Sequence, residues 1–252
     1  MAAYYERYRR GYPPAAVDAI AGAFGLQADD VVVDLGCGTG QLSLPLAARV
    51  RAVVGMDPEP DMLTHARRAA KQRGVGNTLW MLGADSDLPA LGRLLSDGVG
   101  AVTIAVAIHW MDRATLFPAV RPLLRRGGGI AVVTNGTPLW LQDTEWSRTL
   151  RKFLQQWLGR QLTSSCQTDD EGRRLNQQAL TSAGYRVVEW SVDYEAKLTV
   201  DEVVGGVFSA MSVDQLPPPH LREQFAAQVR DAIADQDLTE HVRVWLQLGH
   251  ST

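Results

Sequence analysis

Three glycines at alternate positions follow an acidic residue that ends a short run of β-branched residues. The run is Val31–Val33, the acid is Asp34, and the glycines are Gly36, Gly38 and Gly40. Glycine lets the backbone pass close to a ligand and exposes N–H groups to it. A parallel strand that enters a glycine turn and then a helix is how α/β folds hold the polar end of a cofactor. The stretch therefore predicts a cofactor site.

Two further acids stand at the ends of the next two predicted strands. Asp57 ends the strand 52–56, and Asp85 follows the strand 79–82. The carboxyl ends of parallel strands line one crevice, so we expect both acids beside the glycine turn. An ionised Asp57 can accept hydrogen bonds from two neighbouring hydroxyls, such as those of a ribose.

The elements that must hold these residues alternate between strand and helix as far as Thr134, which implies right-handed crossovers and a parallel sheet. Strands are expected at 31–34, 52–56, 79–82, 100–107 and 130–134, and helices at 14–24, 42–48, 61–73, 88–95 and 114–124. Later helices are expected at 140–158, 175–183, 199–212 and 221–234, and strands at 187–194 and 242–248.

This pattern predicts an α/β fold with a doubly wound, mostly parallel seven-stranded sheet and an inserted helical cap. We expect one domain over 1–252, with a core at about 28–134 plus the C-terminal strands. The cap is expected at about 138–180 and 199–236. The N-terminal segment 4–12 is expected to be a polar arm.

The glycine spacing separates two classes of cofactor. A dinucleotide fingerprint needs G-x-G-x-x-G, and its third glycine would be residue 41. That residue is Gln41, and the third glycine comes one residue earlier, at Gly40. The spacing therefore counts against a nicotinamide oxidoreductase.

The pattern D-x-G-x-G-x-G, followed by Asp57 and by Gly83-Ala84-Asp85, resembles the class I S-adenosylmethionine (SAM)-dependent methyltransferases. The resemblance covers about residues 28–134, with weaker agreement from Val187 to the end. It implies a Rossmann-like fold, SAM as the cofactor and S-adenosylhomocysteine as the product. It also implies in-line methyl transfer to a nucleophile, catalysed chiefly by proximity and alignment.

The resemblance also implies which residues hold the cofactor. The glycine turn meets the methionine end, Asp57 the ribose and Asp85 the adenine, while Met62 packs on the adenine or belongs to the core. The family often folds an N-terminal segment over the cofactor, although a solvated arm is the alternative here. The expected cofactor-binding residues are Asp34, Gly36, Gly38, Gly40, Asp57, Met62, Ala84, Asp85, Tyr5, Arg9 and Tyr12.

The pair His109-Trp110 follows the fourth predicted strand and resembles the His-Trp pair of many small-molecule methyltransferases. His109 is the expected catalytic residue, as a base or a polar contact to the nucleophile, and a structural histidine is the alternative. Acids beside tryptophans in the cap suit a polyhydroxylated or cationic ligand, although such clusters are often only solvated. The expected substrate-binding residues are Trp110, Trp140, Glu145 and Ser209.

Composition excludes several classes of function. The chain has 252 residues, a net charge of −3 and no basic run, so nucleic acid is not an expected partner. Its two cysteines, Cys37 and Cys166, form no C-x-x-C, which argues against a zinc site or disulfide and for a reducing cytoplasm. No uncharged apolar run reaches the roughly 18 residues that span a bilayer, and no signal peptide is expected. We expect no metal, and a monomer or homodimer.

The Arg/Ala-rich composition, His109-Trp110 and the long cap resemble methyltransferases of actinomycete antibiotic pathways. This implies N-methylation of an amino sugar in aminoglycoside biosynthesis, as in the gentamicin pathway. The alternatives are O- or C-methylation of another small metabolite, including a small carboxylic acid or a quinone precursor, and a non-catalytic SAM-binding protein.

Overall fold

The computed structural model describes residues 2–95, 97–162, 167–211 and 215–251. The chain divides into two compact units. We call the first the sheet unit; it consists of Arg10–Asn135, Cys166–Val192 and Val244–Thr252. We call the second the helical unit; it consists of Met1–Arg9, Gly136–Ser165 and Asp193–Arg243.

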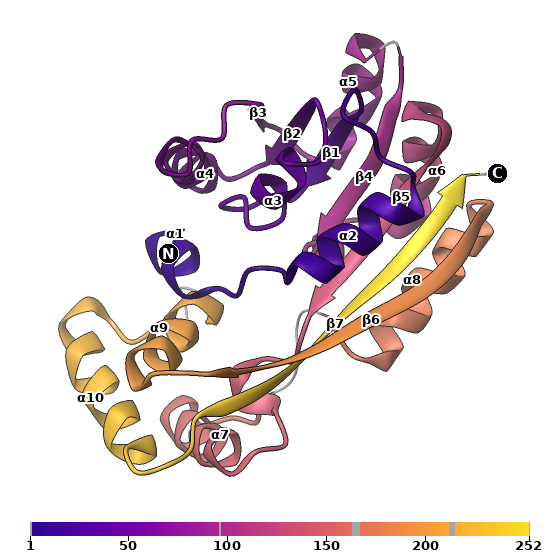
Figure 1. Ribbon diagram of the computed structural model, residues 1–252. Coiled ribbons are helices and arrows are strands. Elements are labelled where there is room, and N and C mark those ends of the chain that lie inside the picture. The colour runs from indigo at the N-terminus through magenta and orange to yellow at the C-terminus, as the bar shows by residue number, and fades with distance from the viewer. Residues whose placement is uncertain (1, 96, 163–166, 212–214, 252) are drawn as a thin grey trace. The chain divides into compact units, whose positions relative to one another are not determined.

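The described residues form a seven-stranded sheet in the order β3-β2-β1-β4-β5-β7-β6 (Figure 1). The pairs β1–β2, β2–β3, β1–β4 and β4–β5 are parallel, and β7 runs antiparallel to β5. The mostly parallel sheet predicted from the sequence is therefore confirmed. The strands are β1 (Val31–Leu35), β2 (Ala52–Asp57), β3 (Thr78–Leu82), β4 (Val99–Ala105), β5 (Leu124–Asn135), β6 (Tyr185–Lys197) and β7 (Thr239–Ser251).

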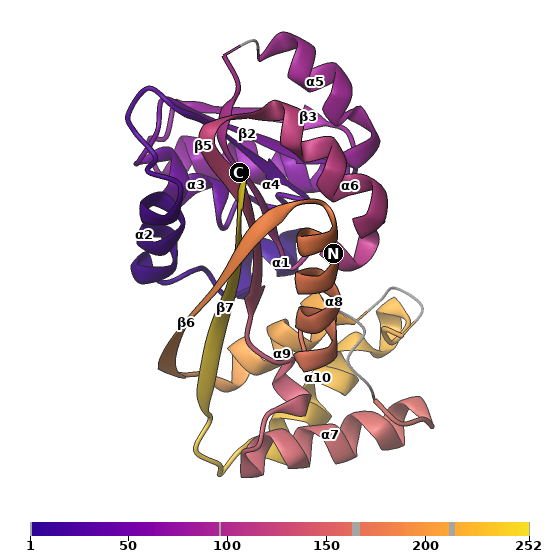
Figure 2. The ribbon, with the colours of Figure 1, turned by 90° about the vertical axis from the view of Figure 1, so that its right-hand side faces the viewer.

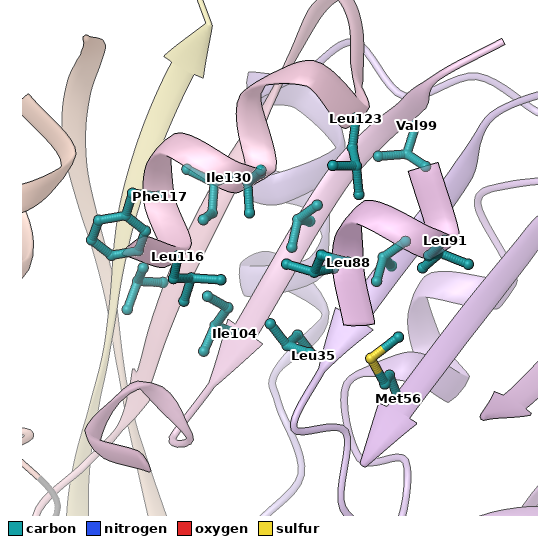
Figure 3. Packing of buried hydrophobic residues seen from close by; sticks show 14 of the residues in the cluster. Leu35, Met56, Leu88, Leu91, Val99, Ile104, Leu116, Phe117, Leu123 and Ile130 are labelled. Carbon is teal, nitrogen blue, oxygen red and sulfur yellow. The ribbon is translucent and has the colours of Figure 1, made fainter. Parts of the chain in front are cut away.

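Helices cover both faces of the parallel part of the sheet, which confirms the doubly wound architecture (Figure 2). One face carries α5 (Leu88–Leu94), α6 (Arg113–Val120) and α8 (Asp170–Ser182), and the other carries α2 (Pro14–Ala23), α3 (Ser43–Ala47) and α4 (Pro60–Gln72). Figure 3 shows Leu88 of α5 and Phe117 of α6 packed with Leu35 and Ile104 of the sheet. Burying each such side chain stabilises the fold by about 1.5–3 kcal/mol.

The segment before β5 differs from its prediction. Helix α6 ends at Val120, a 3₁₀ turn η3 (Arg121–Leu123) follows, and β5 begins at Leu124 rather than at residue 130. The β4–β5 register shifts between Val99 and Ala101, and Gly127 there has a φ of +76°. A Cβ atom at Gly128 would lie 2.8 Å from the Gly100 carbonyl oxygen. The three glycines 127–129 thus form an irregular start to β5, because no side chain fits at Gly128 between the backbones of β5 and β4.

Two other boundaries differ because side chains cap helices at points that periodicity does not reveal. The predicted helix 140–158 is divided into η4 (Leu139–Leu141) and α7 (Glu145–Leu158), since the Thr144 hydroxyl accepts a hydrogen bond from the Ser147 N–H. Helix α8 begins at Asp170, where the Asp169 carboxylate accepts one from the Gly172 N–H. The expected N-terminal arm contains the helix α1 (Ala2–Tyr8).

The helical unit has its own hydrophobic core. It is built from α7, α9 (Val200–Ala210) and α10 (Arg222–Ile233), with η5 (Pro219–Leu221) before α10. Gly205 lets the Tyr8 ring of α1 approach, since a Cβ atom there would lie 2.3 Å from the ring, and Gly206 similarly admits Leu139. Helix α8, which the sequence assigned to the cap, packs through Leu180 in the core of the sheet unit. None of the described helices is long and apolar enough to cross a membrane.

Candidate active site

The glycine turn lies at the carboxyl end of β1, and its shape depends on glycine. The φ angles are +69° at Gly36, +55° at Gly38 and +86° at Gly40, a region that side-chain-bearing residues rarely adopt. A Cβ atom at Gly36 would also lie 2.5 Å from the Ala107 Cβ atom, in the segment after β4. The turn is therefore pressed against the end of a neighbouring strand.

The amides of these glycines donate within the protein, which differs from the expectation that they face a ligand. The Gly36 N–H donates to the Met56 carbonyl at 2.8 Å, and the Gly40 N–H donates to the Cys37 carbonyl at 3.0 Å. The Gly38 N–H donates to a carboxylate oxygen of Asp57 at 2.8 Å. The glycines thus give the turn its close-packed shape rather than donors for a cofactor.

Asp34 is buried beneath the turn, with 1% of its surface exposed. Its two carboxylate oxygens accept hydrogen bonds from the Ser43 hydroxyl at 2.5 Å and from the Thr103 hydroxyl at 2.7 Å. Burial raises the pKa of Asp34 to about 6, against the lowering effect of the two hydroxyls and with a contribution from the nearby Asp57. Asp34 therefore joins β1, α3 and β4 and does not itself present a surface to a ligand, contrary to its predicted role.

Asp57 ends β2 and is placed to serve both the turn and a ligand. Besides the Gly38 N–H, its carboxylate accepts the Glu59 N–H at 2.9 Å. A carboxylate oxygen has two lone pairs, so each oxygen of Asp57 keeps one after these bonds. Asp57 can therefore accept two hydroxyl hydrogens, as the sequence pattern predicts for a ribose.

The segment after β3 presents Asp85 at the same edge of the sheet. Asp85 is half-buried and begins the 3₁₀ turn η1 (Asp85–Asp87). The Ala84 N–H donates to the Asp87 carboxylate at 2.9 Å, so Asp87 rather than a ligand takes that donor. Met62, in the first turn of α4, is also half-buried. Among Ala84, Asp85 and Met62, only Asp85 has a carboxylate that can accept a hydrogen bond from a ligand amino group.

His109 and Trp110 lie in the 3₁₀ turn η2 (Ile108–Trp110), after the carboxyl end of β4. Their ring centroids are 4.9 Å apart. His109 is half-buried, whereas 82% of the Trp110 surface is exposed. Just before them, Val106 has a φ of +52°, which is strained for a β-branched residue. The turn that carries the predicted catalytic residue thus begins at a strained backbone position.

The predicted N-terminal site residues are divided between the two units. Tyr12 is half-buried in the sheet unit. Two hydrogen bonds join Arg10 and Gly11 to Asn135 at the carboxyl end of β5. The Arg10 guanidinium donates to the Asn135 carbonyl at 3.1 Å, and the Asn135 side-chain amide donates to the Gly11 carbonyl at 3.1 Å. Tyr5 and Arg9 belong to the helical unit, where the Arg9 guanidinium lies 5.0 Å from the centre of the Tyr5 ring.

The three predicted substrate residues of the helical unit have different surroundings. Ser209 is buried, and its hydroxyl donates to the Gly206 carbonyl at 2.8 Å. Trp140 is buried in the core of the unit, and its indole N–H has no partner among the described residues. Glu145 is exposed in the first turn of α7. Of the three, only Glu145 has an exposed side chain, because packing encloses the other two.

Several residues of the site were missed from the sequence. Thr103 is the polar member of an otherwise apolar strand, which is a detectable signal, and Ser43 lies in the first turn after the glycines. Asp87 gave no signal, because its sequence neighbourhood does not distinguish its contact with the Ala84 amide from the role of the nearby acid Asp85. Burial also raises the pKa of the Cys37 thiol, so this thiol stays protonated beside the turn.

The residues present fit a nucleoside cofactor. The left-handed glycine turn carries no side chain at Gly36, Gly38 or Gly40, and Asp57 and Asp85 retain acceptor capacity at neighbouring strand ends. Among the described residues, no group of three or more His, Cys, Asp or Glu side chains is arranged to hold a metal ion.

Comparisons with known proteins bear on this site. Residues 32–128 match the family model described as a methyltransferase domain. An uncharacterized methyltransferase of Mycobacterium tuberculosis is 40% identical over 131 residues, which are 52% of this chain and 49% of that protein. CRG1 of Saccharomyces cerevisiae, provisionally assigned as a SAM-dependent methyltransferase, is 30% identical over 129 residues, which are 51% of this chain and 43% of that protein. The chain thus spans about half the length of these curated relatives or less.

Solved structures share the fold. A candidate type II methyltransferase from Anaeromyxobacter dehalogenans superimposes with a TM-score of 0.60 at 20% identity, over 96% of each chain. The YcgJ protein from Bacillus subtilis superimposes with a TM-score of 0.57 at 16% identity, over 94% of this chain and 98% of that one. Together with the strand order, these likenesses define a class I methyltransferase fold.

The family match then identifies the part of the chain that carries the candidate site. The matched residues 32–128 lie in the sheet unit. The glycine turn, Asp57, Asp85 and His109 all fall within the matched residues.

Proposed function

We propose that this protein is a SAM-dependent methyltransferase that acts on a small molecule. The observation that carries the proposal is the bond between the Asp57 carboxylate and the Gly38 N–H, which joins the second strand to the glycine turn inside the matched domain. A non-catalytic SAM-binding protein would need the same arrangement, so turnover is what separates the two functions.

Asp57 and Asp85 would bind the cofactor, and His109 would act on the acceptor. When bound, SAM supplies an electrophilic methyl group. Asp57 accepts hydrogen bonds from the ribose hydroxyls, and Asp85 accepts one from the adenine amino group. His109 accepts the proton that an acceptor amine or hydroxyl loses. Alignment of the acceptor with the methyl group accounts for most of the rate increase.

We propose further roles for residues of the N-terminal segment and of the helical unit, taking each residue by itself. Tyr12 follows Gly11, which is hydrogen-bonded to Asn135 at the carboxyl end of β5. The glycine turn also lies at the carboxyl end of its strand. Tyr5 and Arg9 are proposed to contribute to cofactor binding, and Glu145 to pair with a cationic substrate. Trp110 offers an exposed aromatic face, which suits the apolar side of a sugar ring.

For the acceptor we propose an amino group on a sugar, as in aminoglycoside biosynthesis. The support is the resemblance to antibiotic-pathway methyltransferases, together with an aromatic residue beside a histidine at η2. The alternative is O- or C-methylation of another small metabolite. We also propose a cytoplasmic location, a monomeric or homodimeric state, and no nucleic-acid or membrane partner.

Two measurements test the proposal. Calorimetry with SAM, S-adenosylhomocysteine and NAD reports the cofactor; binding of NAD without binding of SAM would overturn the assignment. Mass spectrometry of aminoglycoside precursors, small carboxylic acids and quinone precursors incubated with SAM then reports the acceptor. One added methyl group on an amino sugar, with release of S-adenosylhomocysteine and a slower reaction by the Asp57→Ala variant at limiting SAM, is the expected result. SAM binding without turnover on any compound would favour the non-catalytic function.

A further inference from the structure

The indole of Trp80 lies directly against the glycine turn. Trp80 is on β3 and pairs in register with Gly55 of β2. A Cβ atom at Gly55 would lie 2.6 Å from the Cε3 and Cζ3 atoms of the indole, and one at Gly40 would lie 2.8 Å from its Cη2 atom. Both glycines therefore leave room for one tryptophan, which spans from the second strand to the last glycine of the turn.

The same side chain contacts the helices that follow the turn and the second strand. Trp80 packs against Leu44 of α3 and against Ala69 and Ala70 of α4. Its main-chain carbonyl accepts a hydrogen bond from the Arg67 guanidinium at 3.2 Å. Trp80 is half-buried, although it lies on the edge strand of the sheet. One residue thus joins β2, β3, α3 and α4 beneath the turn.

Two chain connections transmit the position of the indole to the cofactor residues. The Gly40 carbonyl accepts the Leu44 N–H at 3.0 Å, so movement of Gly40 also moves the start of α3. Gly55 is two residues before Asp57 on β2, and residues at this spacing point to the same face of a strand. Loss of the indole would therefore loosen both the turn and the strand that presents Asp57.

We propose that Trp80 is a positioning residue for the cofactor: its indole holds the Gly40 end of the turn and the Gly55 segment of β2 in the geometry that SAM requires. This inference rests on the proposed function, because it concerns the same cofactor site. It adds a residue that does not itself contact the reacting atoms and that lies outside the glycine and acidic motifs.

The test compares SAM affinity and turnover in Trp80→Ala and Trp80→Phe with the wild type, using calorimetry and the KM and kcat of the methyl transfer. Trp80→Ala is expected to weaken SAM binding by about tenfold, a loss of about 1.4 kcal/mol. The value of kcat at saturating SAM should change much less, because the acceptor side is intact. Trp80→Phe keeps an apolar ring over Gly55 and is expected to restore part of the affinity.

A control separates positioning from general destabilisation. Leu180→Ala removes a fully buried side chain of α8, which packs on α6 in the same unit, and should lower the unfolding temperature comparably. Its SAM affinity should stay at the wild-type value. Equal losses of affinity in Leu180→Ala and Trp80→Ala, or wild-type affinity in Trp80→Ala, would overturn the inference.

A fluorescence measurement covers the case in which Trp80→Ala does not fold. SAM binding should change the tryptophan emission of the wild type, and Trp80→Phe should lose most of that change while still binding SAM. An undiminished change in Trp80→Phe would count against the inference. If the wild type itself binds no SAM, the proposed function fails first, and that outcome is distinct from failure of the role of Trp80.

Discussion

The Asp57 carboxylate accepts a hydrogen bond from the Gly38 backbone N–H at 2.8 Å, and this bond ties the end of β2 to the turn after β1. The acid that we expect to bind the cofactor is therefore also part of the structure that shapes the turn. A substitution at Asp57 should act on both.

The Asp57→Ala variant is expected to bind SAM at least about tenfold more weakly, because it loses a charged acceptor in a largely desolvated site and leaves the Gly38 N–H without its partner. Calorimetry measures the change. Asp57→Asn is the matched control: it keeps an oxygen for the Gly38 N–H but loses the charge, so its affinity should fall between those of the other two proteins. Wild-type affinity in Asp57→Ala would remove this residue from the cofactor site.

The His109→Ala variant is expected to lose turnover by about 100-fold, the scale of general base catalysis, while its affinity for SAM changes little. The reason is that His109 lies in η2, on the predicted acceptor side, and Asp57 and the glycine turn are untouched. Steady-state kinetics and calorimetry on the same preparation give the two numbers. Parallel losses of turnover and affinity, or a loss of folding, would instead identify a structural histidine.

Asp34 should make the folded state less stable as the pH rises through 6. Its pKa is raised to about 6 in the folded protein from 3.8, so the folded state binds a proton more tightly than the unfolded chain between these values. Stability from this group is therefore fully present below about pH 3.8 and is lost as the pH rises from there through the folded pKa of about 6. The expected loss between pH 5 and 7 is about 1 kcal/mol.

The Asp34→Asn variant isolates this contribution, because it is uncharged at every pH and still offers an oxygen and an amide to Thr103 and Ser43. Urea unfolding of both proteins at pH 5 and pH 7 gives the comparison. The wild type should lose about 1 kcal/mol more than the variant over this interval. The same pH dependence in both proteins would contradict the assignment to Asp34.

Val106→Asn is expected to leave the protein as stable as the wild type or up to about 1 kcal/mol more stable, because asparagine tolerates a positive φ better than valine. Val102→Asn, at a fully buried site with ordinary strand geometry, should cost several kcal/mol by contrast. Thermal and urea unfolding provide the comparison. A large loss in Val106→Asn would show that its side-chain packing outweighs the backbone strain.

Much of the sheet unit follows from local patterns. Val31–Val33 predicts a buried strand because three successive β-branched residues favour a strand, and all three are buried. The helix expected from residue 114 begins close to that point, where the Asp112 carboxylate accepts the Ala114 N–H. Helix starts were less predictable where the capping residue lies inside a polar stretch, as at Thr144 and Asp169. The boundary of a helix depends on one hydrogen bond, whereas its existence depends on many positions.

The sequence by itself determined the types and order of the cofactor residues: the alternate glycines, Gln41 in place of a dinucleotide glycine, and acids after the second and third strands. These are local features, because a turn or strand end is specified by neighbouring residues. The tertiary structure decided how they are used. Three pairs join residues from different strands or strand ends: Asp34 with Thr103, Gly38 with Asp57, and Gly55 with Trp80. Such contacts exist only once the strands are in register.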